Sequence, residues 1–315
     1  MVGIKAREIA YVRLSAPDLD TQERFLTAFG LLPAERSDTR LYMRGTDPAQ
    51  YIHVTELGEP KVLGFGWHAA SADDLEVVAA HPDAISAIEA IDGPGGGRRV
   101  RLQDPNGYLA EVVHGIADAG PVEVSPRQMN DARAPLNRKG VLMRTRPGPS
   151  QVKRIAHGVF FTPKFAETLA WYRKTLGFIG SDDLYVDDPS NVVASFNRCD
   201  AGEAYVDHHS FFTMANDRCG LNHVSFEVQD LDDVQLGHDH LKQSGYTHVW
   251  GIGRHVPGSQ IFDYWEDPWG RVHEHWTDSD RLNVSNGTNL VPIAEGLASQ
   301  WGEAPPQRFI GYVTP

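Results

Sequence analysis

The sequence predicts an α+β fold in which four β-α-β-β-β modules pair into two domains. The evidence is that three landmarks recur in the same order in each half of the 315-residue chain. They are a strand followed by a helix that ends at glycine, a strand followed by an acidic helix start, and an Asp-Pro-x-Gly turn before a strand that carries glutamate. Landmarks that recur in a fixed order indicate an internal duplication.

In the first half, between about residues 5 and 116, Ile9 to Leu14 has the composition of a strand. Pro17 to Phe29 is expected to form a helix that ends at Gly30, since glycine readily takes the left-handed conformation that closes a helix. Leu63 to Ala69 predicts the strand of the second landmark. The acidic segment, the turn and its glutamate are Ser71 to Leu75, Asp104-Pro105-Asn106-Gly107 and Glu111.

In the second half, Ile155 to Phe160 predicts a strand, and Pro163 to Leu176 a helix that ends at Gly177. Leu221 to Val228 predicts the strand of the second landmark. The acidic segment, the turn and the closing strand are Asp230 to Val234, Asp267-Pro268-Trp269-Gly270 and Arg271 to Trp276, which carries Glu274.

The remaining segments suggest the division of the chain. Residues 117–151 are rich in Pro, Arg and Asn and are expected to link an N-terminal, non-catalytic module pair (1–116) to a C-terminal, metal-binding catalytic pair (152–280). Residues 281–315 form a tail with a few apolar anchors. We expect the tail to pack near the catalytic domain as a simple docked segment, with coverage of a site as the alternative.

Composition excludes several classes of function. Hydrophobic residues make up 41% and charged residues 23% of the chain, as in an ordinary globular protein. The net charge of −13 without a basic block argues against nucleic acid or an anionic membrane as partner. No run approaches the ~20 apolar residues that span a bilayer. Two distant cysteines, Cys199 and Cys219, fit a reducing cytoplasm.

The duplication also separates scaffold positions from site positions. Aligning the halves places Tyr11 opposite His157, Gly64 opposite His223, and Glu111 opposite Glu274. Only the second half therefore has two histidines and one glutamate at these positions. This ligand set is typical of non-haem Fe(II) sites that react with O2, although zinc accepts it as well.

One long stretch resembles the signature of a known family. Gly253-Arg254-His255, then Phe262-Asp263-Tyr264 and Asp267-Pro268-Trp269-Gly270, then Glu274 is similar to the type I extradiol ring-cleavage dioxygenases of the vicinal oxygen chelate superfamily. Within this family, the sequence from Gly253 to Trp265 looks closest to the trihydroxytoluene-oxygenase-like subgroup. The family usually has an apolar residue before the tyrosine, where this chain has Asp263.

The resemblance implies a fold, a chemistry and roles for single residues. Each domain would be a curved mixed sheet forming an open barrel, and the protein would be a homo-oligomer. His157, His223 and Glu274 would bind Fe(II), with Mn(II) possible, and O2 would be the co-substrate for cleavage of a catechol-type or trihydroxylated ring next to its diol, in aromatic compound degradation. His209 would be the acid/base, and His255 and Tyr264 would bind substrate oxygens. His208, next to His209 in the sequence, is expected to face the opposite side of the same strand.

Two other functions remain open at this point. A metal-dependent lyase or isomerase of the glyoxalase type would use the same fold with a fourth protein ligand, for which Asp207 or His208 could serve. A non-catalytic protein that binds small aromatics would not need the triad. In each case Tyr11 and Trp67 are expected to fill the equivalent positions of the first half, and Asn222 is expected to be a strand-entry residue.

Overall fold

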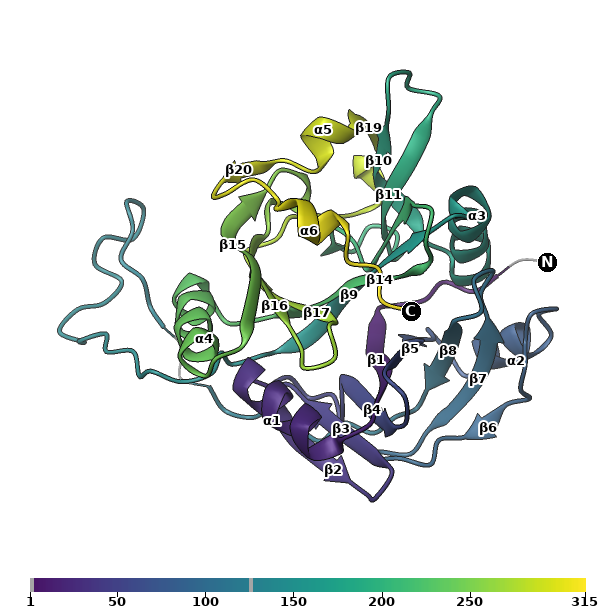
Figure 1. Cartoon of the computed structure of the whole chain (residues 1–315), viewed down its shortest axis with the longest axis horizontal. Coiled ribbons are helices and arrows are strands. Elements are labelled where there is room, and N and C mark those ends of the chain that lie inside the picture. The colour runs from purple at the N-terminus through teal and green to yellow at the C-terminus, as the bar shows by residue number, and fades with distance from the viewer. Residues whose placement is uncertain (1–2, 125–126) are drawn as a thin grey trace.

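The computed structural model describes residues 3–124 and 127–315 and contains two large mixed sheets with few helices (Figure 1). The predicted first domain begins with residues 1–2 and the predicted linker contains residues 125–126, so both expectations fall partly outside the described residues. In the part of the chain that the structure describes, no helix is both long enough and apolar enough to cross a membrane.

The first sheet has the strand order β2-β3-β4-β1-β5-β8-β7-β6. Its strands in chain order are β1 (Ile9–Ala16), β2 (Leu32–Arg36), β3 (Arg40–Arg44), β4 (His53–Leu57), β5 (Lys61–His68), β6 (Glu89–Ala90), β7 (Arg98–Gln103) and β8 (Leu109–His114). Its helices are α1 (Leu19–Phe29) and α2 (Asp73–Ala79).

The second sheet has the order β19-β10-β11-β13-β9-β14-β17-β16-β15-β20. Its strands are β9 (Arg154–Thr162), β10 (Ile179–Tyr185), β11 (Val192–Arg198), β13 (Phe211–Ala215), β14 (Gly220–Glu227), β15 (Thr247–His255), β16 (Ile261–Glu266), β17 (Val272–Thr277), β19 (Asn289–Pro292) and β20 (Ser299–Trp301). The other elements are α3 (Phe165–Leu176), α4 (Leu231–Gln243), η1 (Pro257–Ser259), η2 (Val284–Asn286), α5 (Ile293–Gly296), α6 (Gln307–Ile310) and a small sheet of β12 (Val206–Asp207) with β18 (Arg281–Leu282).

The strand registers of the two sheets match residue by residue. β1 pairs with β5 so that Tyr11 lies opposite Gly66, and β5 pairs with β8 so that Gly66 lies opposite Glu111. In the second sheet Ser225 of β14 takes the same position between His157 and Glu274. The fold class predicted from the duplication is therefore confirmed.

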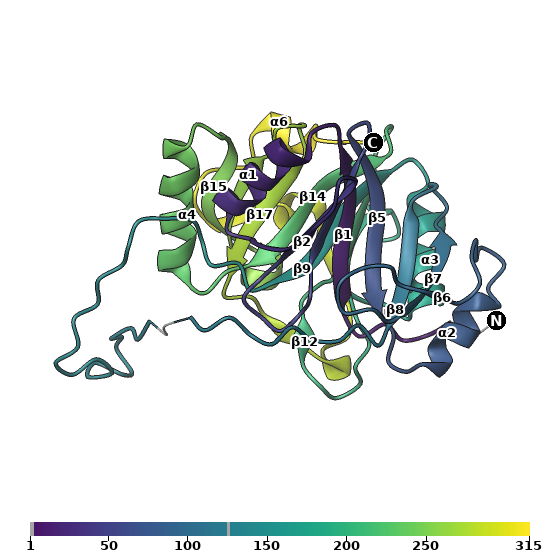
Figure 2. The same ribbon diagram turned by 90° about the horizontal axis from the view of Figure 1, so that it is seen from below.

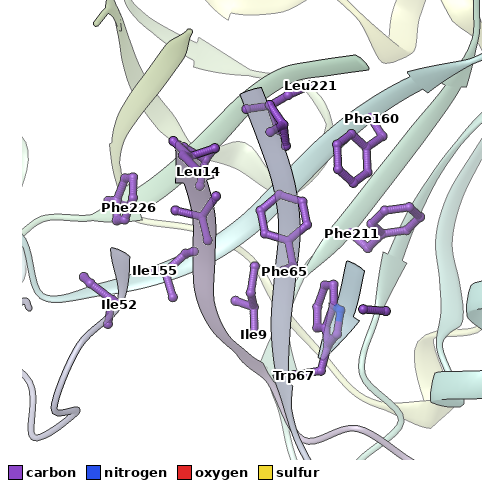
Figure 3. Packing of buried hydrophobic residues seen from close by; sticks show 14 of the residues in the cluster. Ile9, Leu14, Ile52, Phe65, Trp67, Ile155, Phe160, Phe211, Leu221 and Phe226 are labelled. Carbon is purple, nitrogen blue, oxygen red and sulfur yellow. The ribbon is translucent and has the colours of Figure 1, made fainter. Parts of the chain in front are cut away.

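One hydrophobic core joins the two sheets. Figure 3 shows side chains from both halves in this cluster, among them Phe65 and Trp67 of β5 together with Phe160 and Phe211 of the second sheet. The Phe65 ring packs 5.2 Å from the Phe160 ring, centroid to centroid. Gly158 permits this contact, because a Cβ there would lie 2.1 Å from the Phe65 ring. The back of β9 is thus anchored against the first half.

The linker and the tail differ in how they pack. Residues 128–149 run as an extended loop outside the body of the molecule (Figure 2). The loop is held at both ends, since Arg127 forms ion pairs with Asp230 and Asp233 and Ser150 is buried. The tail instead joins the second sheet, since β19 pairs with β10 and β20 pairs with β15. The division at residues 116, 151 and 280 into domains with separate roles stays a prediction.

Candidate metal centre and its cavity

Three neighbouring strands bring the candidate metal ligands together. His157 lies on β9, His223 on β14 and Glu274 on β17, and β14 pairs with both other strands. All three side chains are buried. His157 Nε2 lies 3.1 Å from Glu274 Oε2 and 3.4 Å from His223 Nε2, while His223 Nε2 lies 3.6 Å from the same carboxylate oxygen. Ligands ~2.1 Å from an ion and at right angles to one another would be about 3 Å apart, so the three atoms fit one metal ion.

The carboxylate supports this fit. Among the described residues, neither oxygen of the fully buried Glu274 has a hydrogen-bond partner, and a buried charge without partners is costly. Burial raises the pKa of Glu274, but the neighbouring His157, His255 and His223 lower it more, and the pKa ends well below its usual value. The carboxylate is therefore ionised and free to bind a cation.

Asn222 sets the protonation of one ligand. Its side-chain amide donates to the backbone oxygens of Phe309 and Tyr312 in the tail, at 2.9 and 3.1 Å. Its Oδ1 is consequently an acceptor, and His223 Nδ1 lies 2.7 Å from it. His223 therefore carries its proton on Nδ1 and presents an Nε2 lone pair to the metal position. Burial lowers the pKa of His223 to about 3, which keeps the ring neutral. The sequence-based view of Asn222 as a strand-entry residue missed this link, because the tail residues that orient it are almost ninety positions away.

His209 lies beside the triad and belongs to a chain of buried polar groups. Its ring centroid is 4.0 Å from that of His157. His209 Nδ1 lies 3.1 Å from His208 Nδ1, and His208 Nε2 lies 2.6 Å from Asp182 Oδ2. Since Asp182 accepts from His208, His208 can accept from His209, which leaves a lone pair on His209 Nε2. Burial, with a contribution from His157, holds the pKa of His209 well below its usual value.

One expectation for this segment is wrong, and one role left open for the lyase alternative is not supported. His208 does not face the opposite side of a strand from His209, because both lie in the irregular segment between β12 and β13. Neither His208 nor Asp207 is a fourth ligand, since His208 is bound to Asp182 and Asp207 forms ion pairs with Arg154 and Arg281.

His255 and Tyr264 form a pair next to the triad. His255 Nε2 lies 2.8 Å from Tyr264 Oη and 3.7 Å from Glu274 Oε1. Burial and the charge of Glu274 raise the pKa of Tyr264 well above its ordinary value, so its hydroxyl stays protonated. Burial lowers the pKa of His255, although Glu274 opposes the shift. The pair offers one phenol and one neutral imidazole to a ligand.

A mostly apolar cavity lies over these residues, and the tail covers part of it. Its walls include Phe161, Phe196, Phe212 and Trp250, and its polar lining residues are His157, His209, Asn222, His223, His255, Gln260 and Tyr264. The tail contributes Gly296, Leu297, Pro305, Phe309 and Ile310. The Phe309 ring lies 4.7 Å from that of Tyr264 and 5.9 Å from that of His223. The tail therefore forms part of the cavity wall next to Tyr264 and His223.

The equivalent position in the first half is closed by ion pairs. Glu111 accepts from the Tyr11 hydroxyl at 2.7 Å and from Arg13 Nη1 at 3.0 Å, and Arg99 lies 3.4 Å away. Tyr11 fills this position as expected. Trp67 does not, because its side chain points into the core between the sheets (Figure 3). The sequence comparison missed the two arginines because they have no counterpart among the ligands of the second half.

Asp263, the departure from the family signature, faces away from this cavity. It is fully buried on β16 between Phe262 and Tyr264, which belong to the opposite face. His238 of α4 and His248 of β15 contact its carboxylate. The effect of Asp263 on substrate choice is therefore indirect at most.

Comparison with known proteins places this site in context. Residues 154–274 match the family model described as the Glyoxalase/Bleomycin resistance protein/Dioxygenase superfamily. The chain is 30% identical over 305 residues to Metapyrocatechase 2 of Cupriavidus necator, and the match covers 96% of this chain and 91% of the relative. It is 26% identical over 285 residues to the iron-dependent extradiol dioxygenase of Rhodococcus jostii (strain RHA1), and this match covers 84% of the chain and 86% of that relative.

A solved structure supports the fold alone. The Mn(II)-bound glyoxalase from Novosphingobium aromaticivorans superposes with a TM-score of 0.78 at 24% identity, and the match covers 96% of this chain and 93% of that one. The matched region of the family model contains all three residues of the His157, His223 and Glu274 triad.

Proposed function

The chain belongs to the extradiol dioxygenases of the glyoxalase, bleomycin resistance protein and dioxygenase superfamily, and we propose that it cleaves a catechol-type or trihydroxylated aromatic ring next to its vicinal diol with O2. The observation that carries the proposal is the buried Glu274, whose carboxylate has no hydrogen-bond partner among the described residues and lies 3.1 Å from His157. His157 and His223 line an apolar cavity. The named relatives support the same reaction class.

We propose that His157, His223 and Glu274 hold Fe(II), with Mn(II) as a second metal that the same donors accept. When bound, the metal supplies a Lewis acid for the diol and a redox centre for O2. The protein would supply three ligands, all on one side of the metal ion. No further protein donor from the described residues lies within the triad's ligand cluster, which leaves the other side for small molecules.

The neighbouring residues can handle protons and exclude water. His209, neutral and with its Nδ1 proton directed at His208, can accept a proton from a diol hydroxyl through Nε2 and return it later. Tyr264 can donate its hydroxyl proton in a hydrogen bond to a substrate oxygen, while His255 orients that hydroxyl. The Phe161, Phe196 and Phe212 walls select a flat apolar ring and keep bulk water away.

The lyase or isomerase alternative is not favoured. It requires a fourth protein ligand, and the two candidates are bound elsewhere, Asp207 by arginines and His208 by Asp182.

Reconstitution under anaerobic conditions tests the function. The protein is loaded with Fe(II) or with Mn(II), then mixed with O2 and a panel of catechols and trihydroxybenzenes. We expect consumption of one O2 per diol and a ring-opened product with visible absorbance. Turnover of methylglyoxal–thiol adducts without O2 uptake would contradict the proposal, as would the absence of O2 uptake with every diol.

A further inference from the structure

A second cluster of metal-ligating side chains lies on the outer face of the second sheet. It consists of His238 on α4, His248 at the start of β15 and Asp263 on β16, and we call it the outer cluster. One candidate ligand atom from each residue lies within 4.8 Å of the other two. It shares no residue with the His157, His223 and Glu274 triad.

The geometry converges on one carboxylate oxygen. His248 Nε2 lies 2.8 Å from Asp263 Oδ1, and His238 Nδ1 lies 3.2 Å from both oxygens. Trp265 Nε1 donates to Oδ2 at 2.5 Å, so Oδ1, which both histidines contact, is the oxygen that a cation would share with the two imidazoles. Supporting hydrogen bonds of this kind orient carboxylates that bind metals. Gly251 passes so close that a Cβ there would lie 2.8 Å from Oδ1.

The charge balance also points to a cation. Asp263 is fully buried, and within residues 3–124 and 127–315 its only ion-pair partners are the two histidines. A buried carboxylate needs a compensating positive charge, which a protonated imidazole or a metal ion can provide. The side chains of His238 and His248 are 16% and 31% exposed, so an ion could enter and water could complete its coordination.

We propose that His238, His248 and Asp263 form a second divalent-cation site, of the zinc type, that joins α4 to β15 and β16. Two imidazoles, one carboxylate and one water make a four-coordinate set that zinc accepts. The site is independent of the proposed ring cleavage, because Asp263 faces away from the cavity that Tyr264 lines.

Metal stoichiometry tests this site without any measurement of activity. The iron-loaded protein is incubated with excess ZnCl2, passed through a desalting column, and analysed for zinc and iron by mass spectrometry. We expect one additional zinc per chain with iron unchanged in the wild type. His238→Gln and His248→Gln should lose that zinc and keep their iron. His240→Gln, on the same helix but outside the cluster, should keep both.

A second measurement covers variants that fold poorly. Zinc should raise the Tm of the iron-loaded wild type and of Glu274→Gln, but not that of His248→Gln. Zinc content and zinc-dependent Tm that are equal in the wild type and both outer-cluster variants would overturn the proposal and leave a hydrogen-bonded triad only. Loss of iron in step with zinc uptake would also overturn it, since the zinc would then occupy the inner triad.

Discussion

At the residue level, the same glutamate position serves two different purposes in the two halves. Glu111 is fixed by the Tyr11 hydroxyl and by Arg13, whereas Glu274 has no hydrogen-bond partner among the described residues. The difference comes from Tyr11, Arg13 and Arg99, which surround Glu111, whereas the second half has His157 in place of the tyrosine. Glu111 is held by these contacts, and Glu274 is available to the proposed metal ion.

This contrast gives a matched pair of variants. Glu274→Gln should reduce the iron content per chain to background, because an amide is a far weaker ligand than a carboxylate. Glu111→Gln should keep its iron and lower the Tm, since breaking a buried ion pair costs about 3–5 kcal/mol. Metal analysis and thermal unfolding of both variants check this. Full iron occupancy in Glu274→Gln would refute the ligand assignment.

His209 gives the second prediction at this scale. His209→Asn should lower kcat by ~10²–10⁴-fold, the usual contribution of a general acid or base, because asparagine cannot accept a proton. Catechol should still bind, since the triad is intact. Anaerobic binding titrations and steady-state O2 uptake separate the two effects. A variant that turns over fast and slow substrates at the wild-type rate would show that His209 has no catalytic part.

Aligning the two halves of the sequence identifies the residues that differ between them, but not the contacts that orient those residues. It singled out His157, His223 and Glu274, which the structure brings together. It missed the roles of Asn222 and Asp182, because their partners come from the tail and from an irregular segment. The position of His208 was wrong for the same reason, since strand alternation does not hold outside a strand.

At the level of elements, the tail is the part of the chain that sequence patterns described least well. The helices of the modules end at Gly30 and Gly177 as predicted. By contrast, β19 and β20 are edge strands of four and three residues, which are too short to show periodicity. Their pairing with β10 and β15 depends on tertiary placement alone. The same tail continues into α6, whose Phe309 and Ile310 line the cavity.

Phe309 is the residue through which the tail is expected to act. Phe309→Ala removes a ring that packs against Tyr264 and Trp250 at the cavity, and loss of ~1.4 kcal/mol of apolar contact would raise KM for the diol about tenfold. Leu290→Ala, at an exposed position of β19, is the control and should leave KM unchanged. Steady-state kinetics check both variants, and an unaltered KM in Phe309→Ala would exclude a lid function.

The contact of α4 with β15 and β16 should depend on pH when metal is removed. The hydrogen bond that His238 donates to the Asp263 carboxylate raises the pKa of His238 above its ordinary value against the effect of burial, while Lys242 opposes and Asp239 supports this shift. The folded pKa therefore exceeds the unfolded value of ~6.5, and the stabilisation is complete below that pH and is lost as pH rises through the folded pKa. Asp263, with its pKa lowered mainly by the two histidines against the effect of burial, stays ionised across this range.

The measurement is the Tm difference between wild type and His238→Gln in the presence of a chelator. It should be larger near ~pH 5.5 than near ~pH 9, because only the protonated His238 offsets the buried Asp263 charge. A difference that stays constant over this range would show that the ion pair with Asp263 contributes nothing.

At the level of the whole molecule, the two halves share one core. Trp67 of the first half packs edge to face against Phe178 and Phe211 of the second. Phe65 packs against Phe160, and Figure 3 shows Phe65, Trp67, Phe160 and Phe211 in this core. The alternating apolar pattern of β5 predicts a buried face, but the sequence does not say which surface covers it. The duplication predicted two halves of the same architecture, and the structure shows that the back of one sheet packs against the other.

Phe65 tests this dependence. Its side chain is 1% exposed and lies against Gly158, the residue next to the candidate ligand His157. Phe65→Ala should lower the free energy of unfolding by about 3–5 kcal/mol, because the substitution leaves an empty space between the two sheets. Both halves should then unfold in a single transition at a lower denaturant concentration. Denaturant unfolding checks this, followed by tryptophan fluorescence and separately by iron release. The fluorescence reports Trp67 in the first half and the other six tryptophans in the second half and the tail. Coincident curves at a lower midpoint are expected. If iron were released at the wild-type midpoint while the fluorescence change shifted to lower denaturant, the halves would unfold independently. The stability of the metal site would then not depend on the first half.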